Sequence, residues 1–405
     1  MNAEAMPEDE LRPTVPSPLD YLRPLVEEIG PRGSTTAAEA AAADYALRTL
    51  RNLGLSRVRL ERFLSARSAW RPYAVACGLA VVAALIYPWG GWSTGLVATV
   101  LAAFAMGCAI AEINFYDNPI RRLLPKGPSQ NVVGIAPSRL VPRQRVVLVG
   151  HLDTHRTPFL FRSRGWVVVF AVLVILGFIG GAINIGLYAL GTATGWFWVY
   201  PAALFPTFVL ALIGLACLQA DATPFSVGAN DNASAVGVVL HLAHLLREQP
   251  LLETEVWVLC SGCEEVGCYG MADFLDRYGS DLRGAFFINF EGVGIGKIRY
   301  AAREGMTYPY PSDPALLEVA RRVAARHPDW GASSKVLAAG YTETGLVIQR
   351  GFRGITLVGL DEAGFLPRWH QPSDTLEHLQ PETLQRAALF AWEMLRELDR
   401  EIGSV

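Results

Sequence analysis

Four long apolar runs constrain the fold of this chain more than any other feature. They form two pairs, 72–89 with 92–113 and 166–190 with 196–218, and short uncharged loops join the members of each pair. Apolar runs of about 20 residues cross a bilayer as helices, and Trp near their ends is typical of the membrane interface. A chain with 51% hydrophobic and only 18% charged residues fits that interpretation. The sequence therefore predicts four transmembrane helices in two hairpins; buried helices of a soluble core are the alternative.

Positive charge gathers where the hairpins begin and end. A hairpin returns the chain to the side from which it started, so the segments outside the hairpins share one compartment. Both inter-helix loops are uncharged, whereas the apolar pairs are flanked by Arg57, Arg59, Arg62, Arg67, Arg71, Arg121, Arg122, Lys126, Arg156, Arg162 and Arg164. Because cytoplasmic loops carry an excess of Lys and Arg, the pattern predicts a multi-pass protein of the cell membrane whose soluble part faces the cytoplasm.

The remaining segments indicate one α/β domain that the hairpins interrupt twice. We expect a disordered lead at 1–18, the domain at 19–69, 114–164 and 220–405, and the hairpins at 70–113 and 165–219. Helical spacing of apolar residues predicts helices at 19–29, 35–53 and 235–246. Runs rich in β-branched and aromatic residues predict strands at 56–63, 131–135, 145–149, 255–259, 286–290 and 355–360.

Acidic residues and histidines collect where predicted strands end. They are His151, Asp153, Asp231, Glu264, Glu265, Glu291 and His370. We expect each of them to lie just after a strand. Open α/β sheets place their chemistry at the carboxyl ends of strands, so these side chains can converge on one point. Singly, Asp231 would more often be a helix cap and Glu291 a solvated strand end, but together the residues predict a metal site.

The residue types suit a divalent cation. A neutral imidazole binds zinc best when a carboxylate or carbonyl holds its other ring nitrogen, and Asp153 lies on the same side of extended chain as His151. Mixed nitrogen and oxygen ligands suit zinc, although cobalt or manganese would fit the same set. The six cysteines lack the spacing of a thiolate site and are expected to be buried fillers. A net charge of −3 argues against a nucleic-acid partner.

The motifs together resemble the dizinc aminopeptidase family, which includes bacterial leucyl aminopeptidase, aminopeptidase Y and glutamate carboxypeptidase (peptidase clan MH). They are His-x-Asp at 151–153, Asp-Asn-Ala-Ser at 231–234, Glu-Glu at 264–265, and His370 before Pro-x-Asp-Thr. The resemblance covers about 35–65, 128–153 and 225 to the end. It implies a three-layer α/β/α zinc-peptidase fold with a mixed central sheet, into which the two hairpins are inserted.

The resemblance also implies roles for the site residues. Asp231 would bridge two zinc ions, with His151 and Glu291 completing one site and Glu265 and His370 the other. Glu264 would be the general base, and Asp153 would position His151. Two positions depart from the family pattern: Glu291 stands where Asp is usual, and Trp369 stands where Tyr is frequent. The first could alter metal spacing, and the second removes a phenol that could support the oxyanion.

The function expected from these motifs is that of a membrane-anchored zinc exopeptidase, an aminopeptidase in preference to a carboxypeptidase. Its partners would be a peptide substrate and the lipid bilayer, while the sequence carries no signal for the oligomeric state. Two alternatives belong to other classes. One is a catalytically silent receptor-like or scaffold homologue, and the other is single-zinc acyl transfer of the glutaminyl cyclase type.

Overall fold

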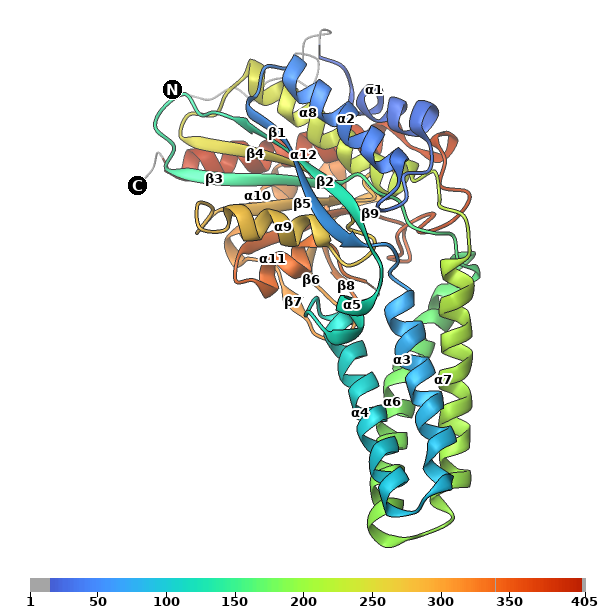
Figure 1. Cartoon of the computed structure of the whole chain (residues 1–405). Helices are drawn as coiled ribbons and strands as arrows, with labels where there is room; N and C mark the ends of the chain where they lie inside the picture. The colour runs from blue at the N-terminus through green and yellow to red at the C-terminus, as the bar shows by residue number, and fades with distance from the viewer. Residues whose placement is uncertain (1–14, 339, 403–405) are drawn as a thin grey trace.

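The computed structural model describes residues 15–338 and 340–402. It consists of an α/β domain from which a bundle of four long helices projects (Figure 1). Most of the predicted lead, 1–14, lies outside the described residues, but its last residue is helical. Helix α1 (Pro18–Pro24) starts there because Ser17 and Asp20 form a capping box and proline suits the first helical position.

A mixed sheet of nine strands forms the centre of the domain. Its order is β1-β2-β4-β3-β5-β9-β6-β7, with β8 beside β6. The four strands β4, β3, β5 and β9 run parallel, so their carboxyl ends share one edge. The pairs β1–β2, β2–β4, β9–β6 and β6–β7 are antiparallel, and β6 pairs with β8 in parallel. The strands are β1 (Ser56–Ala66), β2 (Lys126–Ala136), β3 (Gln144–His151), β4 (Thr254–Ser261), β5 (Phe286–Glu291), β6 (Lys297–Glu304), β7 (Tyr310–Pro311), β8 (Ser333–Leu337) and β9 (Arg353–Leu360).

Helices cover both faces of the sheet. Along β3, Val146 and Leu148 pack under the helices of one face, and Val147 and Val149 pack under those of the other, as the alternation of a buried strand requires. The first face carries α1, α2 (Ala37–Asn52), α8 (Ser234–Glu248), α10 (Pro314–Arg326) and α12 (Pro381–Ile402); the second carries α9 (Tyr269–Tyr278) and α11 (Glu343–Gln349). The predicted three-layer α/β/α fold is confirmed. All six cysteines are free and buried.

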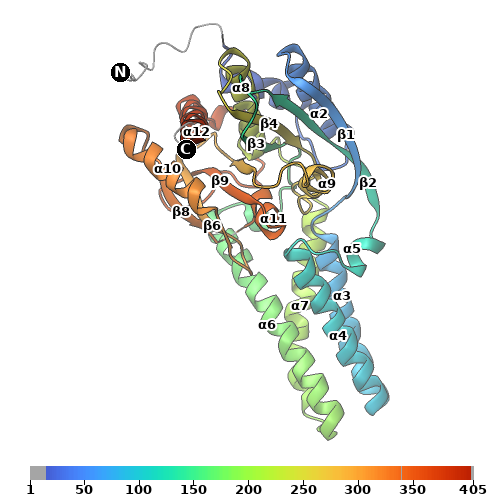
Figure 2. The same ribbon diagram turned by 90° about the vertical axis from the view of Figure 1, so that its left-hand side faces the viewer.

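The four predicted apolar helices are present. They are α3 (Arg71–Ile86), α4 (Trp92–Ile113), α6 (Arg164–Thr194) and α7 (Val199–Asp221). The turn Tyr87–Trp89 extends α3, and the four apolar spans are then 19 to 31 residues long, enough to cross a membrane. Helix α3 contacts α4 and α7, and α6 contacts the same two helices, so the four form a ring (Figure 2).

Small residues face the centre of the bundle, and large apolar residues cover its outside. Ala83, Ala98 and Ala203 are buried between the helices, whereas Leu85 and Phe208 are exposed. Close approach through small residues with an apolar exterior is typical of helices that pack in lipid.

Helix α6 continues beyond its predicted end at Leu190. The segment 191–195 is not a loop, because Thr192 and Thr194 donate hydrogen bonds from Oγ1 to the carbonyls of Tyr188 and Leu190, at 2.6 and 2.7 Å. The helix ends at Gly195, whose φ of 72° belongs to a left-handed cap that glycine adopts without strain.

Both hairpins leave the domain at the edge where the parallel strands end. The pair α3–α4 connects β1 to β2 through α5 (Pro119–Leu123), and the pair α6–α7 connects β3 to α8. Their ends are tied together, since Arg71 Nε lies 2.8 Å from Asp221 Oδ2, and Arg156 Nε lies 3.7 Å from Asp221 Oδ1. The membrane-type helices therefore begin next to the region predicted to hold the metal site.

Candidate metal centre

The structure brings the predicted site residues together at the carboxyl edge of the sheet. His151 ends β3, Glu264 and Glu265 follow β4, Glu291 ends β5, and His370 lies in the loop after β9. Their positions follow from parallel neighbours whose carboxyl ends coincide.

Asp231 departs from the predicted position just after a strand. It lies in the helical turn Ala229–Ala233, between α7 and α8, and none of the described residues 222–228 belongs to a named strand. The reason is the second hairpin, which delivers the chain to this point from the end of a long helix. The prediction of a strand before Asp231 was wrong, although the residue reaches the same centre.

The side chains form two groups that share Asp231. On one side, Asp231 Oδ1 lies 3.4 Å from His151 Nε2, which is also 3.7 Å from Glu291 Oε2. On the other side, Asp231 Oδ2 lies 3.4 Å from His370 Nε2, which is 3.2 Å from Glu265 Oε2. Each oxygen of one carboxylate therefore faces a different histidine.

These residues fit divalent cations. His151 Nε2, Asp231 Oδ2 and Glu265 Oε1 are buried without a hydrogen-bond partner, although buried polar atoms are normally satisfied. Burial raises the pKa of Glu264 and Glu265 well above the usual range for a carboxyl group, and nearby carboxylates add to the shift. Burial also raises the pKa of Glu291 to about 8. Cations would satisfy the free atoms and offset the crowded negative charge, and this nitrogen and oxygen donor set suits zinc.

Asp153 holds the loop that carries both glutamates. Its carboxylate accepts hydrogen bonds from Ser34 Oγ at 2.6 Å and from the backbone N–H groups of Glu264 and Glu265 at 3.0 and 3.2 Å. His151 Nδ1 lies 3.0 Å from the main-chain carbonyl oxygen of Asp153 and 3.5 Å from its carboxylate. The carbonyl is thus the nearer partner of the histidine, and the carboxylate mainly fixes the glutamates.

Two further acidic and amide side chains position Asp231. Asp374, from the Pro-x-Asp-Thr motif, accepts hydrogen bonds from the backbone N–H groups of Asn230 at 2.7 Å and Asp231 at 3.0 Å. Asn232 accepts one at 3.0 Å from the N–H of Gly292, the residue after Glu291. The chain segments that carry Asp231, Glu291 and His370 are therefore tied to one another.

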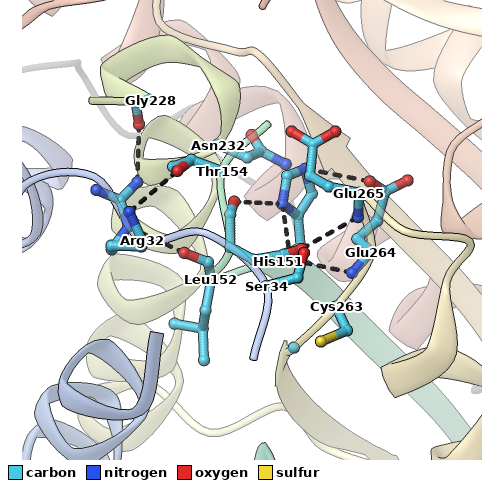
Figure 3. A network of polar contacts seen from close by, with 12 residues as sticks. Arg32, Ser34, His151, Leu152, Thr154, Gly228, Asn232, Cys263, Glu264 and Glu265 are labelled. Atoms are coloured by element: carbon cyan, nitrogen blue, oxygen red, sulfur yellow. Dashed lines mark hydrogen bonds and ion pairs between the residues drawn. The ribbon is translucent and has the colours of Figure 1, made fainter. Parts of the chain in front are cut away.

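Arg32 supports the centre in a way that the sequence did not reveal. It is fully buried, and its guanidinium donates 2.9 Å hydrogen bonds to the carbonyls of Leu25, Gly30, Leu152, Val227 and Gly228. Figure 3 shows it reaching between the loop after His151 and Gly228. Burial lowers the pKa of this guanidinium to about 10. A motif search misses Arg32 because an arginine in a turn gives no sign of burial.

His155 is a second residue that was assigned no role from the sequence. Its ring stacks on that of His370 with centroids 3.6 Å apart, and its donor atoms lie close enough to those of Glu265 and His370 to share a metal ion. Burial lowers its pKa to about 4, so the ring is neutral at pH 7. The sequence shows only that a histidine follows His151 by four residues, and this spacing does not predict that His155 contacts His370.

A cavity of about 300 Å³ opens at the centre and continues between the long helices. The part of the cavity next to the predicted metal site is lined by His155, Glu264, Glu265, His370, Trp369 and Tyr341. Residues of all four long helices line the rest.

Comparison with known proteins agrees with this site. The sequence profile of Peptidase family M28 matches residues 220–395, which include Asp231, Glu264, Glu265, Glu291 and His370. Residues 220–395 belong to peptidase family M28. The family predicted from the motifs is thereby confirmed, while His151, Asp153 and both hairpins precede the matched M28 segment.

Relatives of the M28 segment include aminopeptidase YwaD of Bacillus subtilis, which is 27% identical over 177 residues. That alignment covers 41% of this chain and 37% of the relative, so the chain spans well under half of that protein's length. Among solved structures, BSAP, a zinc aminopeptidase from Bacillus subtilis, matches with a TM-score of 0.56 at 17% sequence identity. The match covers 94% of this chain and 94% of that chain. Glutaminyl cyclase from Bacteroides thetaiotaomicron has a TM-score of 0.54 at 16% identity, with 94% of this chain and 99% of that chain covered. These two structures show a shared fold.

Proposed function

We propose that the chain is a membrane-anchored exopeptidase with two zinc ions, and specifically an aminopeptidase. The observation that carries the proposal is the placement of Asp231 between two histidines, each with its own glutamate. A carboxylate shared in this way suits a pair of cations. The membership of 220–395 in family M28 and the fold of zinc aminopeptidases support the same activity.

The proposed roles divide the site between binding and proton transfer. His151, Asp231 and Glu291 would hold one ion, and Asp231, Glu265 and His370 the other. When bound, the ions supply Lewis acidity, which lowers the pKa of water and polarises a carbonyl group.

Glu264 is the proposed general base. It lies beside the ligands, with Oε2 3.9 Å from His151 Nε2, and its backbone is fixed by Asp153. From this position it would take a proton from the attacking water and pass it to the leaving amine. His155 is placed to hold the His370 ring through stacking. Alternatively, it would contribute a further nitrogen to the ion that Glu265 and His370 would hold.

We place the enzyme in the cell membrane through α3, α4, α6 and α7, with the domain on the cytoplasmic side. The apolar exterior of the bundle supports membrane insertion, and the basic residues near the helix ends support the orientation.

Two other functions remain to be tested against this proposal. A silent scaffold would have no use for a complete ligand set with a base beside it. Single-zinc acyl transfer, as in the glutaminyl cyclases that share the fold, does not need two histidines facing opposite oxygens of one carboxylate.

The test combines metal analysis of the purified chain with a panel of free and N-blocked peptides. We expect two divalent ions per chain and hydrolysis only of peptides with a free amino terminus. One ion with cyclisation of amino-terminal glutamine would favour acyl transfer. Two ions without turnover of any peptide would favour the scaffold, and a preference for blocked peptides would exclude an aminopeptidase.

A further inference from the structure

The cavity between the long helices is not explained by peptide trimming alone. We propose that it binds the hydrocarbon chain of the substrate, so that the enzyme hydrolyses amides that carry a long linear alkyl or acyl chain. This inference rests on the proposed hydrolytic function and names the substrate class for the same site.

The cavity is continuous from the catalytic groups into the bundle. Glu264 and His370 line the part next to the predicted metal site, and Ala80, Ala105, Gly177 and Leu210 line it between the helices, one from each of α3, α4, α6 and α7. Along α6 the lining runs from Phe170 to Asn184, which is a rise of roughly 20 Å. Figure 2 shows α6 diverging from the other three helices toward the domain.

Few polar groups below the metal centre are free to bind a ligand. Glu112 lies in the lining, but its carboxylate pairs with Arg121 at 3.4 Å and accepts a hydrogen bond from Asn118 at 2.8 Å. Asn184, near the far end, donates from Nδ2 to Thr207 Oγ1 at 2.9 Å, while Asn184 Oδ1 and Trp70 Nε1 are the two buried side-chain atoms of these helices' lining without a hydrogen-bond partner among the described residues. The lining is otherwise dominated by alanine, glycine, leucine, isoleucine and aromatic side chains.

This lining favours a hydrocarbon chain over a peptide segment. Each peptide residue other than proline brings one N–H and one C=O that need partners, and leaving them unpaired in an apolar cavity is costly. A methylene chain brings no such groups, and each methylene group that moves from water into the cavity stabilises the complex. The helices are long enough to cross a bilayer, so the cavity would lie beside the acyl chains of the lipids.

The reaction is a simple hydrolysis. The oxygen of water bonds to the amide carbon, the C–N bond breaks, and Glu264 transfers the proton from water to the nitrogen. The acid and amine formed exchange the remaining proton of water, so the products at neutral pH are a carboxylate and an ammonium ion, and no oxidant or further reactant is needed. The long chain can belong to the acyl part or to the amine part of the amide, and the two cases need separate substrates.

The experiment uses the full chain in lipid nanodiscs and measures the release of leucine. One substrate series is N-acetyl-, N-octanoyl- and N-myristoyl-leucine, and the other is leucine coupled to ethylamine, octylamine and tetradecylamine. We expect kcat/KM to rise with chain length in one series, by up to about fourfold per methylene until the cavity is filled. The responding series shows which part of the amide carries the chain. A response of the alkylamide series agrees with the proposed aminopeptidase, whereas a response of the N-acyl series, in which the amino group is blocked, keeps the inference but replaces the aminopeptidase by a hydrolase of N-acyl amino acids.

A matched pair of variants on α6 tests whether the cavity causes the rise. In Gly177→Leu the new side chain starts 3.3 Å from Ile213 Cδ1, another lining atom, and narrows the cavity. Gly186 has no atom within 4 Å of an added Cβ and lies outside the lining, so Gly186→Leu is the control. We expect Gly177→Leu to lower the ratio of kcat/KM for the longest over the shortest substrate at least tenfold, and Gly186→Leu to leave that ratio unchanged.

Met106→Ala gives a second test in the opposite direction. Met106 Cε lies 2.7 Å from an added Cβ at Gly181 and fills part of the cavity, so its removal should move the preferred chain to a greater length. Metal content and a single gel-filtration peak show that each variant is folded.

Three results would overturn the inference. If leucyl peptides are cleaved but neither series responds to chain length, the inference is wrong and the peptidase proposal stands. If kcat/KM is instead higher for pentaleucine than for shorter leucyl peptides, and Gly177→Leu removes that difference, the cavity binds peptide. If no amide is hydrolysed by protein with both metals bound, the inference and the proposed function fail together.

Discussion

Glu264 and Glu265 are sequence neighbours with different proposed roles, and substitution of each by glutamine separates them. Glu264→Gln keeps the shape of the side chain but removes the base, so we expect both metals to remain and turnover to fall by a factor on the order of 10² to 10⁴. Glu265→Gln should lower metal content toward one ion per chain, because an amide oxygen is a poorer ligand than a carboxylate. Metal analysis and peptide hydrolysis of both variants beside wild type decide the matter. Wild-type turnover by Glu264→Gln would exclude it as the base.

Arg32 offers a test of how the centre is supported. Arg32→Met removes five hydrogen bonds to main-chain carbonyls, and only those of Leu25 and Gly228 keep a backbone donor among the described residues, so we expect the Tm in detergent to fall by roughly 5 °C or more. Arg32→Lys retains a charge but fewer donors, so its Tm should be intermediate.

Arg386→Met is the matched control for Arg32→Met, because Arg386 is exposed on α12. Its Tm should stay close to that of wild type. An equal loss of stability in the two methionine variants would mean that the buried hydrogen bonds of Arg32 contribute little.

At the scale of residues, the candidate site residues and the supporting residue Asp153 were predictable, whereas the supporting roles of Arg32 and His155 were not. His151, Glu264, Glu265 and Glu291 stand out because each follows a strand whose β-branched and aromatic residues are legible in the sequence. Asp231 was found by motif, but its local structure was predicted wrongly because a long helix precedes it. The stacking of His155 on His370 joins residues far apart in the chain, and the burial of Arg32 depends on loops from three segments.

Among the elements, helix α4 carries two glycines that test how the bundle packs. An added Cβ at Gly95 would collide with Thr192 Oγ1 of α6, whereas an added Cβ at Gly107 would have no other atom within 4 Å. We expect Gly95→Leu to cost about 1–3 kcal/mol of stability through overpacking, and Gly107→Leu to cost little. Thermal unfolding in detergent measures both. Equal Tm values for the two variants would contradict the close contact between α4 and α6.

The existence of these elements could be predicted better than their ends or their spacing. The apolar runs gave all four long helices, yet α6 extends past its predicted end to the left-handed cap at Gly195. The cavity could not be foreseen, since it depends on how far the helices stand apart, and periodicity carries no information on that distance.

The orientation of the whole molecule in the membrane can be tested with single cysteines. In the proposed orientation the domain lies in the cytoplasm, so Ala193→Cys, near the far end of α6, should react with an impermeant maleimide added to intact cells. Asp281→Cys, exposed on the domain, should react only after the cells are opened. All six native cysteines are buried, which keeps the background low. The reverse labelling pattern would put the active site outside the cell.

The strand order has a consequence for how the protein is made. Strand β3 pairs only with β4 and β5, yet the ribosome completes the second hairpin before it reaches either of them. Since domains form as their segments emerge during synthesis, β3 stays unpaired until α6 and α7 have been made. If these helices insert into the membrane as proposed, their insertion comes before closure of the sheet, and a helix that inserts late would leave His151 on a strand without neighbours.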